Sequence, residues 1–166
     1  MKRDFRAPAV PLIANDPMFS VWSFADCLTE DATRHWTGVR QYMIGVLQVD
    51  GVLYEFLGNL NPVNDRYYGG YEKMEQMSCE IRPMTTTYTF RTPQVQLQLR
   101  FTSPLLLDDL DVLSWPVTYM SYQVQSRDGK NHACRIYFGF SGEFCVNDPS
   151  QNVAVGLDAH SIFFTS

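Results

Sequence analysis

The stretch Gln94-Val95-Gln96-Leu97-Gln98-Leu99-Arg100-Phe101 alternates polar and apolar side chains without a break. Successive side chains of a β-strand point to opposite faces of a sheet, so this period of two predicts a strand with one buried and one wet face. The same alternation occurs upstream, over residues 77–82 and 87–91, on either side of Pro83-Met84. We expect those two segments to pair as antiparallel strands.

Two Asp-Gly dipeptides predict further hairpins, because these residues tolerate the positive φ angles of tight turns. Asp50-Gly51 separates apolar segments at residues 42–49 and 52–57, and Asp128-Gly129 separates residues 117–125 from residues 132–140. In the second hairpin the alternation assigns these side chains to the core: Met120, Tyr122, Val124, Cys134, Ile136, Phe138 and Phe140.

Residues 143–146, 153–157 and 161–165 are expected to form three more short strands, and no window carries an apolar stripe with helical spacing. Many short strands with almost no helix predict an all-β fold, an antiparallel β-sandwich, with a barrel as the alternative. Pro8, Pro11 and Pro17 exclude a long helix near the N-terminus, and Asn15-Asp16-Pro17 predicts a turn. We therefore expect residues 1–38 to be an extended, non-regular N-terminal segment packed on a sandwich of residues 39–166. Because the sequence stops on an apolar run at residues 162–164, we expect this sandwich to be truncated at its C-terminus.

Composition narrows the class of protein. The chain has 166 residues with Lys+Arg 13 against Asp+Glu 18, a formal net charge of -5, which disfavours a nucleic-acid binder. No apolar run approaches the ~20 residues of a membrane-spanning helix. The basic N-terminus leads into Pro8 rather than an apolar signal core, so we expect either a cytosolic protein or one whose signal has been removed.

Metal and cofactor chemistry finds little support in the sequence. Cys27, Cys79, Cys134 and Cys145 are scattered without C-x-x-C spacing, so buried thiols are the simplest interpretation and disulfide pairing stays open. No glycine-rich phosphate-binding motif is present, and we expect no cofactor. The carboxylates of Asp108, Asp109 and Asp111 fit either a connection that caps its own turn or, less well, a calcium site.

The densest group of candidate functional residues lies in the N-terminal segment. Aromatic rings beside polar groups in loops can hold sugar rings or other small polar ligands, but they can equally anchor an irregular segment to a core. His35 could also act as a general base, and Arg34 could pair with Asp16 or Asp31. The candidates for ligand binding or for a domain interface are Asp16, Trp22, Arg34, His35, Trp36 and, in an aromatic loop further on, Tyr68. We assign no catalytic residue and no metal ligand.

Four sequence motifs carry a family resemblance; they lie at residues 6–13, 15–23, 34–38 and 103–119. Together and in this order they resemble the N-terminal all-β region of the glutaminase A family. The resemblance implies a larger protein, in which this region precedes a C-terminal α/α barrel related to those of glycoside hydrolases. It also implies a secreted or periplasmic location.

Three functional hypotheses follow. On the strength of the resemblance, the favoured one is a non-catalytic accessory domain that packs on the α/α barrel of the same polypeptide and shapes its active-site rim. The alternative is a carbohydrate-binding module in which Trp22, Trp36 and the loop at residues 67–71 bind a small polar or carbohydrate ligand. The third is a small self-contained enzyme that uses His35 with an aspartate.

Overall fold

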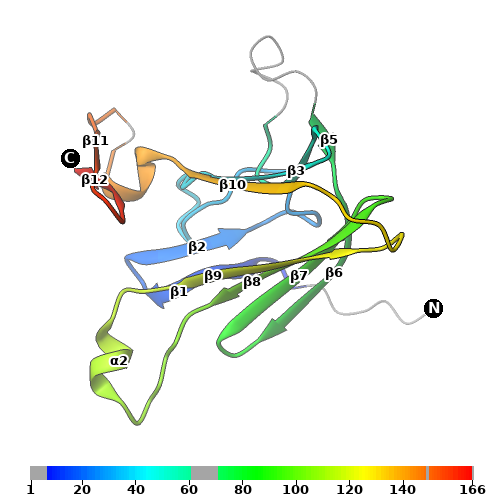
Figure 1. Cartoon of the computed structure of the whole chain (residues 1–166). Helices are drawn as coiled ribbons and strands as arrows, with labels where there is room; N and C mark the ends of the chain where they lie inside the picture. The colour runs from blue at the N-terminus through cyan, green and yellow to red at the C-terminus, as the bar shows by residue number, and fades with distance from the viewer. Residues whose placement is uncertain (1–6, 61–70, 149, 166) are drawn as a thin grey trace.

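Two four-stranded β-sheets dominate the computed structural model, which describes residues 7–60, 71–148 and 150–165 (Figure 1). One sheet has the order β10-β3-β4-β5, formed by Cys134–Phe140, Met43–Val49, Val52–Leu57 and Tyr71–Lys73. The other has the order β6-β7-β8-β9, formed by Glu75–Arg82, Thr85–Arg91, Val95–Thr102 and Tyr119–Ser126. Neighbouring strands are antiparallel except β4 and β5, which are parallel.

The remaining elements are small. A first hairpin consists of β1 (Val10–Asp16) and β2 (Phe19–Ser23), and a last hairpin consists of β11 (Ala154–Leu157) and β12 (Ile162–Thr165). One helical turn, α2 (Leu110–Ser114), precedes β9, and a 3₁₀ turn, η1 (Gly142–Cys145), follows β10.

The core lies between the two sheets. Phe56 of β4 contacts Phe90 of β7 with ring centroids 5.9 Å apart, and it meets Phe138 of β10 edge to face at 5.5 Å. The predicted inner face of β8 is buried throughout, from Val95 to Phe101. Each large side chain that is fully buried contributes about 1.5–3 kcal/mol of hydrophobic free energy. The predicted all-β, sandwich-like fold is thereby confirmed.

The N-terminal segment is more regular than the sequence predicts. Residues 10–23 pair with each other as the β1–β2 hairpin, which turns at the predicted Asp16-Pro17, and residues 25–31 run through bends and turns. Leu12, Ile13 and Val21 lie in the same hydrophobic cluster as the two sheets. The Thr86 hydroxyl of β7 also donates to the carbonyl oxygen of Pro11 at 2.6 Å. Pro11 does not prevent pairing, because a strand at a sheet edge tolerates a missing N–H, and Pro8 precedes β1.

Of the two Asp-Gly turns, the first is confirmed and the second prediction is wrong. Asp50 and Gly51 have φ angles of 50° and 93° and join β3 to β4 as a tight hairpin. The chain around Asp128-Gly129 instead crosses between the sheets, since β9 pairs with β8 and β10 pairs with β3. A turn signal is local, so it cannot distinguish a hairpin from an arch whose two strands find other partners.

Smaller departures have local causes. Residues 142–145 form a 3₁₀ turn rather than a strand, and Asp109 starts the unpredicted helix α2 by accepting a hydrogen bond from the Val112 N–H at 3.1 Å. Three side chains assigned to the core are exposed, because β9 and β10 are the edge strands of their sheets. They are Tyr122, Cys134 and Phe140. All four cysteines are free, and only Cys27 is partly buried, so the expectation of buried thiols is also wrong.

Candidate functional site

The turn between β1 and β2 places the first candidate residue. Asp16 ends β1, and its Oδ1 accepts hydrogen bonds from the backbone N–H groups of Met18 at 2.7 Å and Phe19 at 3.0 Å. An Asp that bonds the backbone two and three residues ahead stabilises a tight turn. This carboxylate oxygen therefore shapes the hairpin, and it presents the carbonyl of Pro17 to the neighbouring loop.

That loop, residues 34–40, is attached to the turn by two adjacent side chains. The Nε2 of His35 and the Nε1 of Trp36 both donate to the carbonyl oxygen of Pro17, at 2.9 Å and 2.7 Å. Because a carbonyl only accepts, Nε2 of His35 carries a proton, while Nδ1 lies 2.8 Å from the Thr37 hydroxyl. We call this pair of hydrogen bonds to Pro17 the Pro17 staple.

Arg34 and Trp22 lie at the base of the same loop. Their backbones exchange two hydrogen bonds, from Trp22 N to Arg34 O at 2.7 Å and from Arg34 N to Trp22 O at 3.0 Å. The Arg34 guanidinium pairs with Asp31 at 3.1 Å, so Asp31 is its partner rather than Asp16. This hydrogen bond holds the pKa of Asp31 below its ordinary value.

The structure thus brings five of the six sequence-predicted candidates into one cluster, which joins the β1–β2 turn to the loop at residues 34–40. Both ring nitrogens of His35 have partners, and no described aspartate bonds to that ring. Trp36 presents the one large exposed ring of the five, with 57% of its surface accessible. Tyr68 lies outside the described residues.

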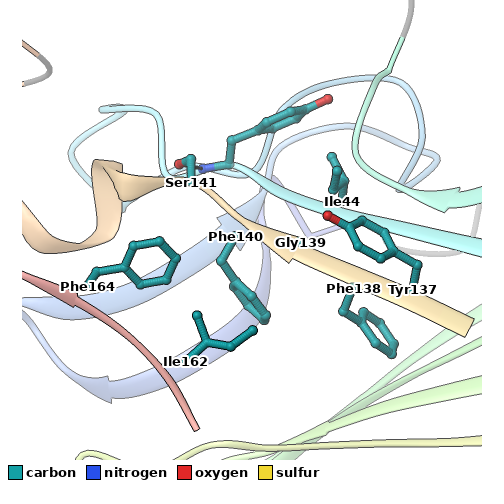
Figure 2. A pocket seen from close by; sticks show the side chains of 9 residues that line it. Ile44, Tyr137, Phe138, Gly139, Phe140, Ser141, Ile162 and Phe164 are labelled. Atoms are coloured by element: carbon teal, nitrogen blue, oxygen red, sulfur yellow. Dashed lines mark hydrogen bonds between the residues drawn. The ribbon is translucent and has the colours of Figure 1, made fainter. Parts of the chain in front are cut away.

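A larger concave feature lies along β10, where sequence analysis assigned no site. We call it the β10 groove; its volume is about 620 Å³. Figure 2 shows Ile162 and Phe164 of β12 on one side of it, with β10 and Ile44 of β3 on the other. The groove is lined by Tyr42, Ile44, Tyr137, Phe138, Gly139, Phe140, Ser141, Ile162 and Phe164.

A second pocket of about 440 Å³ shares Tyr42, Ile44 and Tyr137 with this groove and extends over the outer face of the same sheet to Leu53 of β4. Beside Leu53 on this strand lies Glu55, a carboxylate with only 2% of its surface exposed. It accepts a hydrogen bond from the Leu60 N–H at 2.6 Å, yet burial raises its pKa above the ordinary value for a glutamate. Burial also raises the pKa of Tyr42, whose hydroxyl donates to the Asn59 carbonyl at 2.6 Å.

One sequence signal could have indicated this face. Residues 43–47 read Met-Ile-Gly-Val-Leu, an unbroken apolar run. A strand with one wet face alternates, whereas a strand covered on both faces is apolar throughout. The run at residues 43–47 is therefore typical of a strand whose outer face is meant to be covered.

Two findings on the described part of the chain concern clusters of metal-ligating side chains and membrane-spanning helices. Within it, no group of three His, Cys, Asp or Glu side chains is arranged to hold a metal ion. No helix among residues 7–60, 71–148 and 150–165 has the length and apolar character needed to cross a bilayer.

Two family models match this chain. The family models "Domain of unknown function (DUF4964)" and "Domain of unknown function (DUF5127)" match residues 1–63 and 84–164. Both are consistent with the N-terminal region of glutaminase-like proteins. No solved structure matches the chain.

A relative that the chain matches is Glutaminase A of Aspergillus oryzae (strain ATCC 42149 / RIB 40). It is 29% identical over 154 residues, an alignment that covers 86% of this chain and 21% of the relative. The resemblance to the N-terminal all-β region of the glutaminase A family is thereby confirmed. The chain spans about a fifth of the length of this relative, and the match lies in the relative's N-terminal part.

Proposed function

We propose that this chain is a non-catalytic accessory domain of a larger glutaminase-like hydrolase, and that it packs on the catalytic α/α barrel and shapes the rim of its active site. The observation that carries the proposal is the match to only 21% of Glutaminase A, at its N-terminal part. A region that small, with its own core, is typical of a domain joined to a larger catalytic unit.

The arrangement of the candidate residues supports this role. A general base needs a free nitrogen within reach of substrate. In His35, Nε2 donates to the Pro17 carbonyl and Nδ1 contacts the Thr37 hydroxyl, so neither nitrogen is free. Arg34 is engaged by Asp31, and Asp16 by the turn. These side chains hold the loop at residues 34–40 in place, which is a structural role.

The experiment compares glutamine hydrolysis by full-length protein carrying His35→Gln with the same protein carrying His160→Gln. His160 is an exposed histidine in the turn between β11 and β12, so it is a matched control. An accessory role predicts that kcat stays within about twofold for both variants, since a residue that does not touch substrate leaves the chemical step unchanged. A loss of kcat above about a hundredfold for His35→Gln alone would refute the proposal and assign His35 to the reaction.

Exposure of the Trp36 ring favours a second candidate, a carbohydrate-binding surface. The Nε1 bond to Pro17 fixes this indole while leaving 57% of the residue accessible, and a fixed exposed ring can stack on a sugar. Trp115 is a suitable control because it is also exposed but follows α2, in another loop. Weaker binding of soluble oligosaccharides by Trp36→Ala than by Trp115→Ala, measured by calorimetry, would support this function. Equal heats for the two variants would rule it out.

A further inference from the structure

The β10 strand is an edge strand without the protection that such strands usually carry. Its only strand partner in the described part of the chain is β3. Natural proteins blunt free edges with charges, prolines or bulges, because an open row of N–H and C=O groups pairs with other chains. Cys134–Phe140 contains one charge, Arg135, no proline and no bulge in its register.

One edge strand of the other sheet, β6, offers a direct contrast. Glu75–Arg82, which forms β6, carries Glu75, Glu80 and Arg82, and its register with β7 shifts between Gln76 and Ser78. That edge has both charges and a bulge. The other edge of that sheet, β9 (Tyr119–Ser126), also has no charge, proline or bulge, so β10 differs from β6 but not from β9. What distinguishes β10 is the apolar groove beside it, which Ile162 and Phe164 of β12 help to line.

Hydrogen bonds at the two ends of the β10–β3 ladder show which backbone groups are open. The N–H of Asp50 donates to the Ala133 carbonyl at 3.0 Å, and the N–H of Ser141 donates to the Tyr42 carbonyl at 2.9 Å. Bonded pairs alternate along an antiparallel ladder, so the odd-numbered residues of β10 face β3. The N–H and C=O groups of Ile136, Phe138 and Phe140 consequently point to the free edge.

This free edge opens into the β10 groove. The far wall is Ile162 and Phe164, from a two-stranded hairpin that pairs with no other described strand. An isolated two-stranded hairpin is only marginally stable in water and needs a further strand or a packing surface. Ile162 is nevertheless 67% exposed, so β12 also has apolar surface to cover.

We propose that the free edge of β10 is a strand-pairing site, occupied by an extended segment of the remaining polypeptide of the full-length glutaminase-like protein. The inference rests on the proposed function and names the surface that serves it. The occupant is taken from the same polypeptide because the matched relative has nearly four-fifths of its length outside the match. Strand addition to an open edge supplies main-chain hydrogen bonds, and side-chain pockets select the sequence.

The walls of the groove define the chemistry of the incoming strand. On one face of β10 lie Phe138 and Phe140, and on the other lies Tyr137. Side chains of an added strand alternate between these two faces. Because both faces are apolar, the segment that pairs here has apolar side chains at consecutive positions over four to eight residues, roughly the length of a covered strand.

Hydrogen–deuterium exchange tests the proposal, with the full-length protein compared against the 166-residue chain. We expect amides in residues 134–140 to exchange at least about tenfold more slowly in the full-length protein, because pairing closes their free edge. The β6 peptide, residues 75–82, is the internal control and is expected to exchange equally in both. The β8 peptide reports whether the shorter chain retains its fold.

A pair of matched substitutions in the full-length protein adds a second measurement. Phe140→Lys places a charge beside the open edge of β10, and Ile81→Lys places one on β6; the two residues are 43% and 45% exposed. Phe140→Lys should remove most of the added protection of residues 134–140, whereas Ile81→Lys should leave it intact. Should Phe140→Lys misfold, the comparison of wild-type proteins decides alone.

The outcomes separate this inference from the function on which it rests. Protection that appears on other surfaces of the chain but not on β10 overturns the pairing site and leaves the accessory role standing. No protection anywhere, with free release of the chain by limited proteolysis, overturns both. Equal protection of β10 in the 166-residue chain, rising with its concentration, overturns the proposal in favour of a second copy as occupant.

Discussion

The Pro17 staple makes a quantitative prediction about what the candidate residues do. Trp36→Phe removes the Nε1 donor and keeps most of the ring, and His35→Ala removes the second donor to the same carbonyl. A hydrogen bond contributes a net 0.5–1.5 kcal/mol, and these two lie at an exposed site, so each single variant should lose about 0.5–1 kcal/mol of unfolding free energy.

The double variant should lose more than the sum of the two. With one donor left, the Pro17 carbonyl still attaches the loop at residues 34–40 to the β1–β2 turn. When both donors are gone, the loop loses this attachment, and we expect an interaction free energy of at least about 0.5 kcal/mol. The direction of this non-additivity distinguishes a shared anchor from two independent surface contacts.

The assay is urea denaturation of the folded chain followed by far-UV circular dichroism, which avoids the change in tryptophan fluorescence. The mid-point and slope together give the unfolding free energy of each variant. Thr37→Ala serves as a control for the Nδ1 contact, which does not involve Pro17. If the double variant unfolds within about 0.2 kcal/mol of the unmodified chain, the staple has no structural role and the reasoning fails. The ligand-binding interpretation of these residues would then gain ground.

Two further predictions concern the core and the pH dependence. A Cβ added at Gly45 would lie 2.5 Å from Cζ of Phe56, so Gly45→Ala should destabilise the chain by about 1–3 kcal/mol in urea melts, and Phe56→Leu should relieve part of this cost. A full cost that persists with Phe56→Leu would show that the ring is not the obstacle. His132 donates from Nδ1 to Asp50 at 2.6 Å and from Nε2 to Asp128 at 2.9 Å; these bonds raise the pKa of His132, lower the pKa of Asp50 and lower the pKa of Asp128 to about 2. The stability that the raised pKa of His132 contributes is fully present below its unfolded pKa of 6.5 and is lost as pH rises through the folded pKa. The stability that the lowered pKa values of Asp50 and Asp128 contribute is present above their unfolded pKa of 3.8 and is lost as pH falls through their folded pKa values. Stability should therefore peak between these limits, and His132→Gln should flatten the curve of thermal mid-point against pH. An unchanged curve in that variant would contradict a stabilising role for the His132 contacts with Asp50 and Asp128.

Strand positions could be predicted well because they depend on local pattern. The alternation at residues 94–101 and the Asp50-Gly51 turn each carry their information within a few residues, and both are confirmed. The sequence-based predictions were wrong where they had to specify which strand pairs with which. Asp128-Gly129 indicates only that the chain turns, and the pairing of β9 with β8 and β10 with β3 depends on residues far away in sequence.

The candidate site divides in the same way. The sequence indicated that Asp16, Trp22, Arg34, His35 and Trp36 matter, since turn formers, aromatics and charges gather there. It could not indicate that the Pro17 carbonyl is the common acceptor of His35 and Trp36, because the hydrogen bonds join positions 18 and 19 residues apart. The β10 groove was not found at all, since β3, β10 and β12 form it together.

By itself, the sequence determined the all-β class, most strand positions and the family resemblance, because periodicity and the order of motifs depend only on residues that are near one another along the chain. Only the tertiary structure decided which strands are edges, and hence which apolar side chains are exposed. The alternation of polar and apolar residues along a strand is the same whether the strand lies at an edge or in the middle of a sheet. Whether Phe140 or Tyr122 is buried therefore depends on whether a neighbouring strand covers it, which the alternation does not reveal. For the same reason the open edge of β10, and the pairing site proposed there, became visible only once the strand order was known.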